Sequence, residues 1–316
     1  MIKVKNLSRN FGSITAVDNV TFDANVGEVL GFLGPNGAGK TTTMRIITGY
    51  LEPSAGKVSV GGADVRNEPK KAKRQIGYLP ENAPIYRDMH VLGFLKFIAE
   101  IRNLKGQKAK DAIDRTISIC HLDSVLYQSI DTLSKGYVRR TVLAQAILHD
   151  PPILILDEPT DGLDPNQKHE VRKLINTLST DKVIIISTHI LEEVEACCTR
   201  AIIIANGRIV ANDSPQKLKS MSDAAGSIVM GIGNCSFETV RESLSGLDFI
   251  SRVSDAGSND NCAKVRVVPS KTSSGGVICD LSTFARQKSW EISDFYMDSG
   301  HLNEVFRTIT TENKGE

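Results

Sequence analysis

The sequence lacks the features that would suit it to a membrane span, a disulfide scaffold or a nucleic-acid surface. Its longest apolar runs have four to six residues, such as ILIL at 153–156, whereas a membrane helix needs about 20. The six cysteines include no CxxC pair, which favours reduced thiols in a cytosolic compartment. A net charge of +1 indicates neither a nucleic-acid footprint nor an acidic tail. No apolar segment follows the basic start MIKVK, so we expect no signal peptide.

The apolar residues, 41% of the 316, form short runs that predict buried strands. VLGFL at 29–33, ILIL at 153–156 and VIIIS at 183–187 have the length of strands. Longer amphipathic stretches separate them, and strands that alternate with helices predict an α/β sheet. Asn206 and Gly207 lie between AIIIA and RIVA and predict a hairpin, because Asn-Gly adopts the positive φ angles of a type I′ turn.

Changes in composition divide the chain. Residues 84–150 have helical periodicity and few strand signals, which predicts a helical subdomain inserted in the sheet domain. Near Met221 the stretch SDAAGS is small and polar and predicts a linker, so we expect domains at 1–222 and 223–316. The second domain has the order strand, helix, strand, strand, helix, strand, which predicts a small α+β, ferredoxin-like sandwich. The residues predicted for its core are Val265, Val267, Phe284 and Trp290.

A glycine-rich segment, GPNGAGKT at 34–41, follows the first of these strands and precedes a segment that can begin a helix. This is the spacing and the context of a phosphate-binding loop. Glycines let backbone N–H groups converge on phosphate oxygens, and the helix N-terminus adds positive potential. We expect Lys40 to contact the β- and γ-phosphates and the Thr41 hydroxyl to bind Mg²⁺. The alternative is a glycine-rich turn with an incidental lysine.

Two carboxylates, Asp157 and Glu158, end the strand that contains ILIL. Ligands of α/β sheets bind at the carboxyl ends of strands. We expect Asp157 to hold Mg²⁺, directly or through water, and Glu158 to polarise a water that attacks the γ-phosphate. Acidic residues at a strand end are often only solvated, but beside a phosphate loop they predict a site of nucleotide hydrolysis.

Four motifs occur in one order along the chain: GPNGAGKTT, LSKGY at 133–137, ILILDEPTDGLD at 153–164 and STH at 187–189. This order resembles the ABC ATPase family, and the likeness extends from residue 1 to about 220. The chain looks most similar to the ATPases of ABC-2-type exporters, including those linked to drug efflux and bacterial gliding. The resemblance implies a P-loop ABC ATPase cassette that uses ATP and Mg²⁺.

LSKGY resembles the family signature LSGGQ, with Lys135 in place of a glycine and Tyr137 in place of the glutamine. In the family this loop comes from the opposite subunit and contacts the γ-phosphate, which implies a dimer that holds two ATP molecules between its subunits. Ser134 can also cap the following helix, and Gly136 allows close backbone approach. We expect Lys135 to face solvent; the alternative is a cation near the nucleotide.

For several other residues, the role that we expect is implied only by the resemblance to the family. Glu81 stands where the family's Q-loop has glutamine, and is implied either as an Mg²⁺ ligand or as a residue that only couples the site to a permease. His189 is implied as a contact of the γ-phosphate. Phe11 resembles the aromatic residue that stacks on adenine, the alternative being an apolar strand residue. Asp164 belongs to a segment that resembles the D-loop, which crosses the dimer interface; Asp161 and Gly162 depart from the usual motif there.

The resemblance therefore implies three sets of site residues. The catalytic set is Glu158, His189 and Lys40. The ATP contacts are Phe11, Gly34, Pro35, Asn36, Gly37, Ala38, Gly39, Lys40, Thr41, Thr42, Ser134, Gly136 and Asp164. The metal ligands are Thr41, Glu81 and Asp157.

The function implied is the ATP-hydrolysing subunit of an exporter whose permease is a separate integral-membrane chain. The partners implied are that permease and a second ATPase subunit, another copy of the chain, with no nucleic acid; the place implied is cytoplasmic, on the inner face of the cell membrane. The alternative is a soluble ABC ATPase that acts on ribosomes or DNA. Such proteins carry two cassettes or a long coiled coil, but here only 92 residues separate Lys40 from Thr132. A third possibility is a binding module without enzymatic activity. The presence of all the catalytic residue types argues against it.

Overall fold

The computed structural model describes residues 1–259, 261–270 and 276–312, which fall into two compact units. Unit 1 comprises Met1–Pro215 together with residues 309–312, and unit 2 comprises Gln216–Thr308. Within the described ranges, no helix combines the length and the apolar character needed to cross a membrane.

A six-stranded sheet with the order β10-β9-β3-β8-β7-β6 forms the centre of unit 1. All neighbouring strands are parallel except in the hairpin β9–β10, where Asn206 and Gly207 have φ angles of 48° and 77° and confirm the predicted turn. Every residue of β3, β7 and β8 is buried, as is usual for parallel strands covered on both faces. The strands are β3 Val29–Leu33, β6 Ile76–Leu79, β7 Ile153–Asp157, β8 Val183–Thr188, β9 Arg200–Ala205 and β10 Arg208–Asp213.

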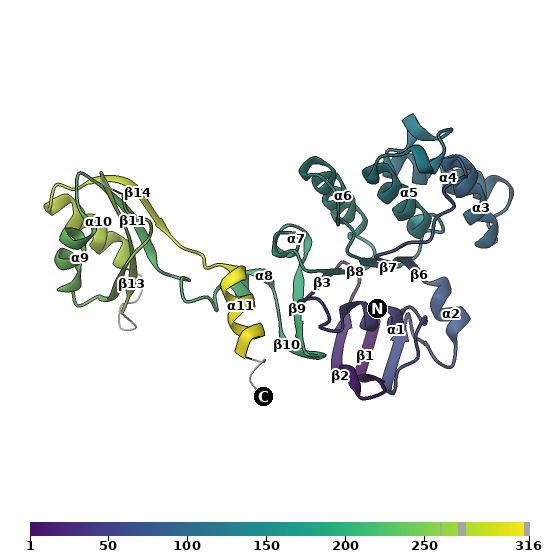
Figure 1. The fold of residues 1–316 in the computed structure, drawn as a ribbon, viewed down its shortest axis with the longest axis horizontal. Coiled ribbons are helices and arrows are strands. Elements are labelled where there is room, and N and C mark those ends of the chain that lie inside the picture. The colour runs from purple at the N-terminus through teal and green to yellow at the C-terminus, as the bar shows by residue number, and fades with distance from the viewer. Residues whose placement is uncertain (260, 271–275, 313–316) are drawn as a thin grey trace. The chain divides into compact units, whose positions relative to one another are not determined.

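One face of this sheet packs against an antiparallel sheet with the order β2-β1-β4-β5 and against helix α1 (Figure 1). Phe22 of β2, Met44 of α1 and Ile155 of β7 belong to one buried cluster. The sequence analysis did not predict this second sheet. Its elements and the adjoining helices are β1 Ile2–Phe11, β2 Ile14–Ala24, α1 Lys40–Ile47, β4 Ala55–Val60, β5 Ala63–Asp64 and α2 Pro69–Arg74.

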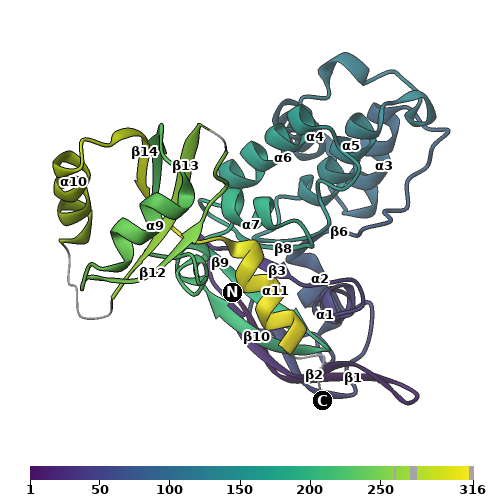
Figure 2. The ribbon, with the colours of Figure 1, turned by 60° about the vertical axis from the view of Figure 1, so that its left-hand side comes forward.

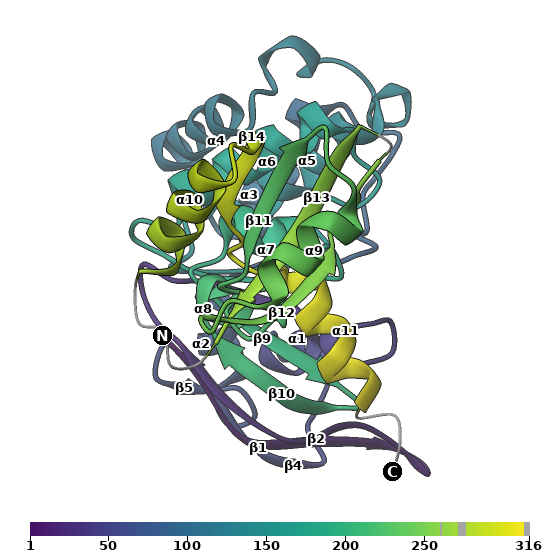
Figure 3. The same cartoon turned by 90° about the vertical axis from the view of Figure 1, so that its left-hand side faces the viewer.

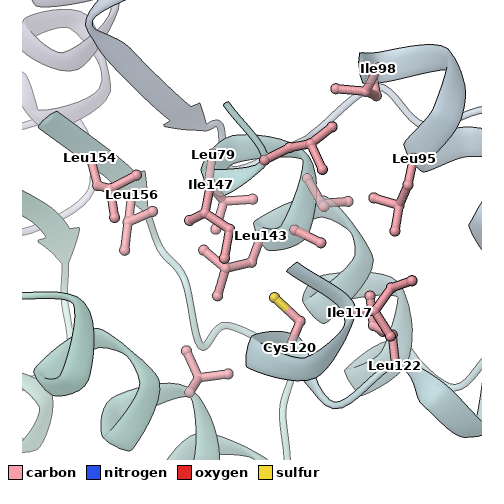
Figure 4. Packing of buried hydrophobic residues seen from close by; sticks show 14 of the residues in the cluster. Leu79, Leu95, Ile98, Ile117, Cys120, Leu122, Leu143, Ile147, Leu154 and Leu156 are labelled. Carbon is pink, nitrogen blue, oxygen red and sulfur yellow. The ribbon is translucent and has the colours of Figure 1, made fainter. Parts of the chain in front are cut away.

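The other face of the six-stranded sheet is covered by helices (Figure 1). Leu95, Ile117 and Leu143, one from each of three of these helices, belong to the same buried cluster as Leu154 and Leu156 of β7 (Figure 4). These three helices lie in the region predicted to be helical. The bounds are α3 Val91–Ile101, α4 Gly106–Cys120, α5 Lys135–Ile147, α6 Pro165–Leu178 and α7 Leu191–Cys197.

Unit 2 contains an antiparallel sheet with the order β12-β13-β11-β14, which is the ferredoxin-like order expected from the sequence (Figure 2 and Figure 3). Helices α9 and α10 pack on one face of it around the buried Val265 and Val267. Phe284 and Trp290 pack edge to face beside this core, with ring centroids 5.6 Å apart. Two helices extend into unit 1, since α8 begins and α11 ends there. The elements are α8 Pro215–Lys219, β11 Ile228–Gly233, α9 Phe237–Ser245, β12 Ile250–Asp255, β13 Cys262–Pro269, α10 Val277–Gln287, β14 Glu291–Met297 and α11 Leu302–Glu312.

The segment 222–227, predicted to be a linker, is packed instead. Ser222, Ala224 and Ser227 are all buried. The Ser227 hydroxyl donates to the Ala224 carbonyl oxygen at 2.6 Å, and the Ser222 hydroxyl donates to the Glu304 carboxylate. The prediction was wrong because small polar side chains suit a tightly packed turn as well as a flexible connection.

Candidate functional site

The loop at 34–39 joins β3 to α1 and encloses the side chain of Lys40. Gly39 has a φ of 104°, and a Cβ there would lie 2.4 Å from the carbonyl oxygen of Ala16, so glycine alone fits. The Lys40 ammonium donates to the Gly34 carbonyl oxygen at 2.7 Å. The strand–loop–helix context expected for a phosphate loop is therefore present.

Asp157, at the end of β7, is completely buried. Its Oδ1 accepts a hydrogen bond from the Ser187 hydroxyl and lies 3.5 Å from Oγ1 of Thr41. Its Oδ2 is buried and has no hydrogen-bond partner among the described residues. A buried acceptor left unsatisfied costs about 1–3 kcal/mol, so this oxygen suits a cation or a water. Because Mg²⁺ prefers one or two carboxylates together with water and phosphate oxygens, Asp157 and Thr41 fit a magnesium site.

Glu158 follows in the left-handed conformation, with a φ of 49°. For a residue other than glycine this backbone costs about 1–3 kcal/mol, and such residues concentrate at functional sites. Its carboxylate is nearly buried, with Oε2 2.9 Å from Nδ1 of His189 and Oε1 3.8 Å from Nζ of Lys40. His189 directly follows β8, the neighbour of β7, so two parallel strands bring both groups to one edge of the sheet.

Burial lowers the pKa of Lys40, and the charges of Glu158, Asp157 and Glu81 partly offset that effect. The site therefore holds one desolvated cation among several acids. A phosphate that approached Lys40 would add to the stabilisation of its ammonium form.

Lys40, Glu158 and His189 line one open pocket of about 440 Å³, within the size range of small-molecule sites, whereas Asp157 is not among its lining residues. Ala16 and Asp161 also line it, and neither was predicted. For Asp161 the sequence did contain a clue, because this residue departs from the family's D-loop pattern. The predicted residues that line the pocket are Pro35, Asn36, Gly37, Ala38, Gly39, Lys40, Thr41, Thr42, Glu81, Glu158 and His189.

Glu81 lines this pocket without joining a metal cluster. Among the described residues, no three side chains of His, Cys, Asp or Glu are grouped so that they could hold a metal. A magnesium ion would thus depend on Asp157, Thr41 and phosphate oxygens. The assignment of Glu81 as a ligand stays a prediction.

Phe11 lies at the end of β1 beside the turn to β2, and its side chain is exposed. The guanidinium of Arg9 lies 4.6 Å from the centre of its ring. The residues that line the phosphate-loop pocket do not include Phe11. Stacking of its ring on adenine stays a prediction.

The signature segment forms a separate, smaller pocket of about 180 Å³. Ser134 caps α5, as predicted, and accepts a hydrogen bond from the Tyr137 amide at 3.4 Å. Gly136 lies so close to α6 that a Cβ would be 2.5 Å from the side-chain amide carbon of Gln167. Among the described residues, the signature pocket and the phosphate-loop pocket share no lining residue.

Two further predicted positions have clear local surroundings. Asp164 caps α6, where its Oδ1 accepts a hydrogen bond from the Gln167 amide at 2.9 Å. This cap helps to place Gln167 against the signature segment; a direct contact of Asp164 with ATP stays a prediction. Lys135 is exposed, as expected.

Comparison with known proteins gives a consistent result. The family model for the ABC transporter matches residues 17–161. The uncharacterized ABC transporter ATP-binding protein YhcH of Bacillus subtilis is 37% identical over 66% of this chain and 68% of its own length. A Nod factor export ATP-binding protein of Burkholderia orbicola is 34% identical over 69% of this chain and 72% of its own length.

The chain spans only 38% of one longer relative, which is named as a probable multidrug ABC transporter ATP-binding protein, YbhF of Escherichia coli; the two are 34% identical over 70% of this chain. Among solved structures, an ATP-binding subunit of an ABC transporter superposes with a TM-score of 0.64, at 30% identity, over 70% of this chain and 92% of that chain. The cbiO1 protein of Clostridium perfringens, part of the ABC transporter complex cbiONQ, gives a TM-score of 0.62 at 27% identity over 69% of this chain and 89% of its own.

Proposed function

The chain belongs to the ABC transporter family of ATP-binding proteins, and from this membership we propose that it binds and hydrolyses ATP to power a separate membrane permease. The observation that carries the proposal is that Lys40, Glu158 and His189 line one pocket. The buried Asp157 lies beside it, with its Oδ1 3.5 Å from Oγ1 of Thr41, which also lines that pocket. A phosphate loop, an open buried carboxylate oxygen and a carboxylate–histidine pair are together suited to phosphoryl transfer.

The reaction would be in-line attack of water on the γ-phosphorus, which breaks the bond to the bridging oxygen and releases ADP and phosphate. The Glu158 carboxylate would orient the water and accept its proton. His189, whose Nδ1 lies 2.9 Å from Glu158, would present its other ring nitrogen to a γ-phosphate oxygen. Lys40 would neutralise charge on the transferring group. Asp157 and Thr41 would hold Mg²⁺, which would supply positive charge to the phosphates of ATP.

We propose that the active form is a dimer of this chain. Support comes from the two separate pockets, since Ser134 and Gly136 line one and the phosphate loop lines the other. Two chains placed head to tail could close each phosphate loop with the signature segment of the other. The residues of the signature pocket would then contact ATP only after two chains associate.

Export is the direction of transport that we propose, with an ABC-2-type permease. Support comes from the names of two relatives, one for multidrug transport and one for Nod factor export. The permease would hold the chain at the cytoplasmic face of the cell membrane. Unit 2, which has its own core and none of the nucleotide motifs, would regulate the ATPase or its dimer.

The competing function is that of a soluble ABC ATPase acting on ribosomes or DNA. The two longest described helices between the phosphate loop and the signature, α3 and α4, have 11 and 15 residues, which is short for the long coiled coil of a DNA-repair ATPase. Nor does the chain repeat the phosphate-loop motif of a two-cassette translation factor.

One experiment separates these functions. Phosphate release by the purified chain is measured with ATP and Mg²⁺ and with EDTA added, and the tagged chain is then purified from detergent-solubilised membranes. We expect magnesium-dependent hydrolysis and an integral-membrane chain that co-purifies. Absence of hydrolysis would contradict the ATPase assignment, and co-purification with ribosomes instead of a membrane chain would favour the alternative.

A further inference from the structure

Arg139, on α5, contacts the candidate site entirely through backbone oxygens. Its Nε donates to the Pro159 carbonyl oxygen at 3.0 Å and its Nη1 donates to that of Glu81 at 3.1 Å. Its Nη2 donates to the carbonyl oxygens of Asp157, at 2.9 Å, and of Glu158. One guanidinium thus joins the strand end that carries both acids to the loop that carries Glu81.

The surroundings of the Arg139 guanidinium suit it to hold several backbone groups in place. Burial lowers the pKa of Arg139, and the nearby acids Asp161, Asp157, Glu158 and Glu81 offset that effect in this order. Because arginine remains protonated in proteins, the cation persists here, and its hydrogen-bond partners among the described residues are backbone carbonyl groups. Its planar fork can meet several acceptors at once, which a lysine ammonium on a flexible stem cannot reproduce.

The two carbonyl groups bound by Nη2 flank the α-carbon of Glu158. The Asp157 carbonyl belongs to the peptide before it, and the Glu158 carbonyl belongs to the peptide after it. Both peptide planes are therefore held while Glu158 has its left-handed φ of 49°. The direction of the carboxylate toward His189 depends on these planes, because the Cα–Cβ bond is fixed relative to them.

We propose that Arg139 is a positioning residue, which holds the backbone of Glu158 so that its carboxylate is directed at His189 and at the attacking water. The inference rests on the proposed ATPase function. Arg139 lies in the same helix that Ser134 caps. A shift of the signature end of α5 would therefore move the backbone that carries the chain's own catalytic carboxylate, and this would link the two sites of a dimer.

The test compares Arg139→Lys, and Arg139→Gln as a second variant, with the control Arg115→Lys. Arg115, on α4, also donates to a backbone carbonyl oxygen, that of Leu148 at 3.2 Å, but it lies outside the pocket. For Arg139→Lys we expect kcat to fall about 10- to 100-fold, as for a small misplacement of a catalytic group. We expect KM for ATP to change less than about 3-fold, because the phosphate loop is intact. The control should retain normal kcat. Unchanged kcat in both Arg139 variants would overturn the proposal.

A double-mutant cycle distinguishes positioning from a general structural role. If Arg139 acts through Glu158, adding Arg139→Lys to Glu158→Gln should lower the residual rate less than about 3-fold, because the carboxylate it positions is already lost. Independent, multiplying losses would overturn the proposal.

A readout without turnover separates this proposal from the proposed function. Hydrogen–deuterium exchange at the Asp161 amide, which donates to the Glu158 carbonyl oxygen at 3.2 Å, should accelerate about 10-fold or more in Arg139→Lys and not in Arg115→Lys. If the wild-type chain hydrolyses no ATP, the function fails while faster exchange still supports the positioning role. Unchanged exchange would overturn that role whatever the ATPase result.

Discussion

The two units of the chain place titratable side chains at different positions of their sheets, and the side chains have different partners as a result. In unit 1, β7 and β8 are buried along their length, and the titratable side chains of Glu158 and His189 come directly after these strands. In unit 2, the charges of β13 lie within the strand and alternate with buried valines. There Arg266 meets Asp298 at 2.9 Å, and that carboxylate also accepts the Gly300 amide.

The difference shows how position, more than residue type, separates binding from folding. At the ends of β7 and β8, Glu158 and His189 pair with each other and line a pocket, so they are available to a ligand. A charge within an antiparallel strand finds a partner on a neighbouring element and stabilises the sheet. The comparison predicts that acids in unit 1 matter for turnover and that acids in unit 2 matter for stability.

The largest effect should come from Glu158→Gln. The amide keeps the size of the side chain but cannot accept a proton from water, so kcat should fall about 10² to 10⁴-fold while ATP still binds. ATP should then accumulate in a stable dimer, visible by size-exclusion chromatography. The matched control is Glu304→Gln in unit 2, where the carboxylate accepts the Ser222 hydroxyl; near-normal turnover in both variants would break the comparison.

Next in size is Lys40→Ala, which removes the cation of the phosphate loop. A charged hydrogen bond contributes about 1.5–3 kcal/mol, so ATP affinity should fall about 10- to 150-fold. Equilibrium binding of a fluorescent ATP analogue measures the change. The control is Lys264→Ala, a lysine of β13 that pairs with Asp294 at 3.7 Å and should leave affinity unaltered. Equal affinities for the two variants would mean that the loop is only a turn.

A smaller, different effect is expected from Asp298→Asn. This change removes the charge that Arg266 and the Gly300 amide bind, and should lower the free energy of unfolding of unit 2 by about 1.5–3 kcal/mol. Thermal unfolding followed by circular dichroism measures the stability, and Glu242→Gln, on the exposed side of α9, is the control. ATP affinity should not change; a loss of affinity would show that the acids of unit 2 serve the nucleotide site after all.

The smallest effect on ATP should follow from removing unit 2. We expect deletion of residues 216–308, with a flexible linker in their place, to change ATP affinity less than about 3-fold, because all the nucleotide motifs lie in unit 1. Circular dichroism must first show that the remaining unit is folded. A folded protein that no longer binds ATP would refute the separation of roles. A simple truncation after Ser222 is the weaker design, since it also removes residues 309–312 of unit 1.

The sequence predicts the phosphate loop, the acidic strand end and the hairpin because each depends on local chemistry. Only glycine fits at position 39, and the pair Asn206-Gly207 favours the tight turn of the hairpin by itself. The antiparallel sheet of unit 1 was not predicted, because its strands are irregular. β1 and β2 pair with several register shifts, and Asn6 and Asn19 have positive φ angles there, which obscures the alternation of polar and apolar residues.

The candidate site shows the same division. Lys40, Asp157, Glu158 and His189 could be named in advance because each belongs to a sequence motif. Arg139 could not, since its partners are backbone oxygens, which every residue possesses, and no pattern of side chains records them. Contacts of this kind follow only from the three-dimensional path of the chain.

The division of the chain also sets an order of events during synthesis. Unit 1 contains residues 309–312, which follow the whole of unit 2 along the chain. A ribosome adds about 5–20 residues per second, so the roughly 90 residues of unit 2 delay this last piece by about 5–20 s. During that interval the nascent chain contains every residue of the phosphate-loop pocket but lacks residues 309–312 of unit 1.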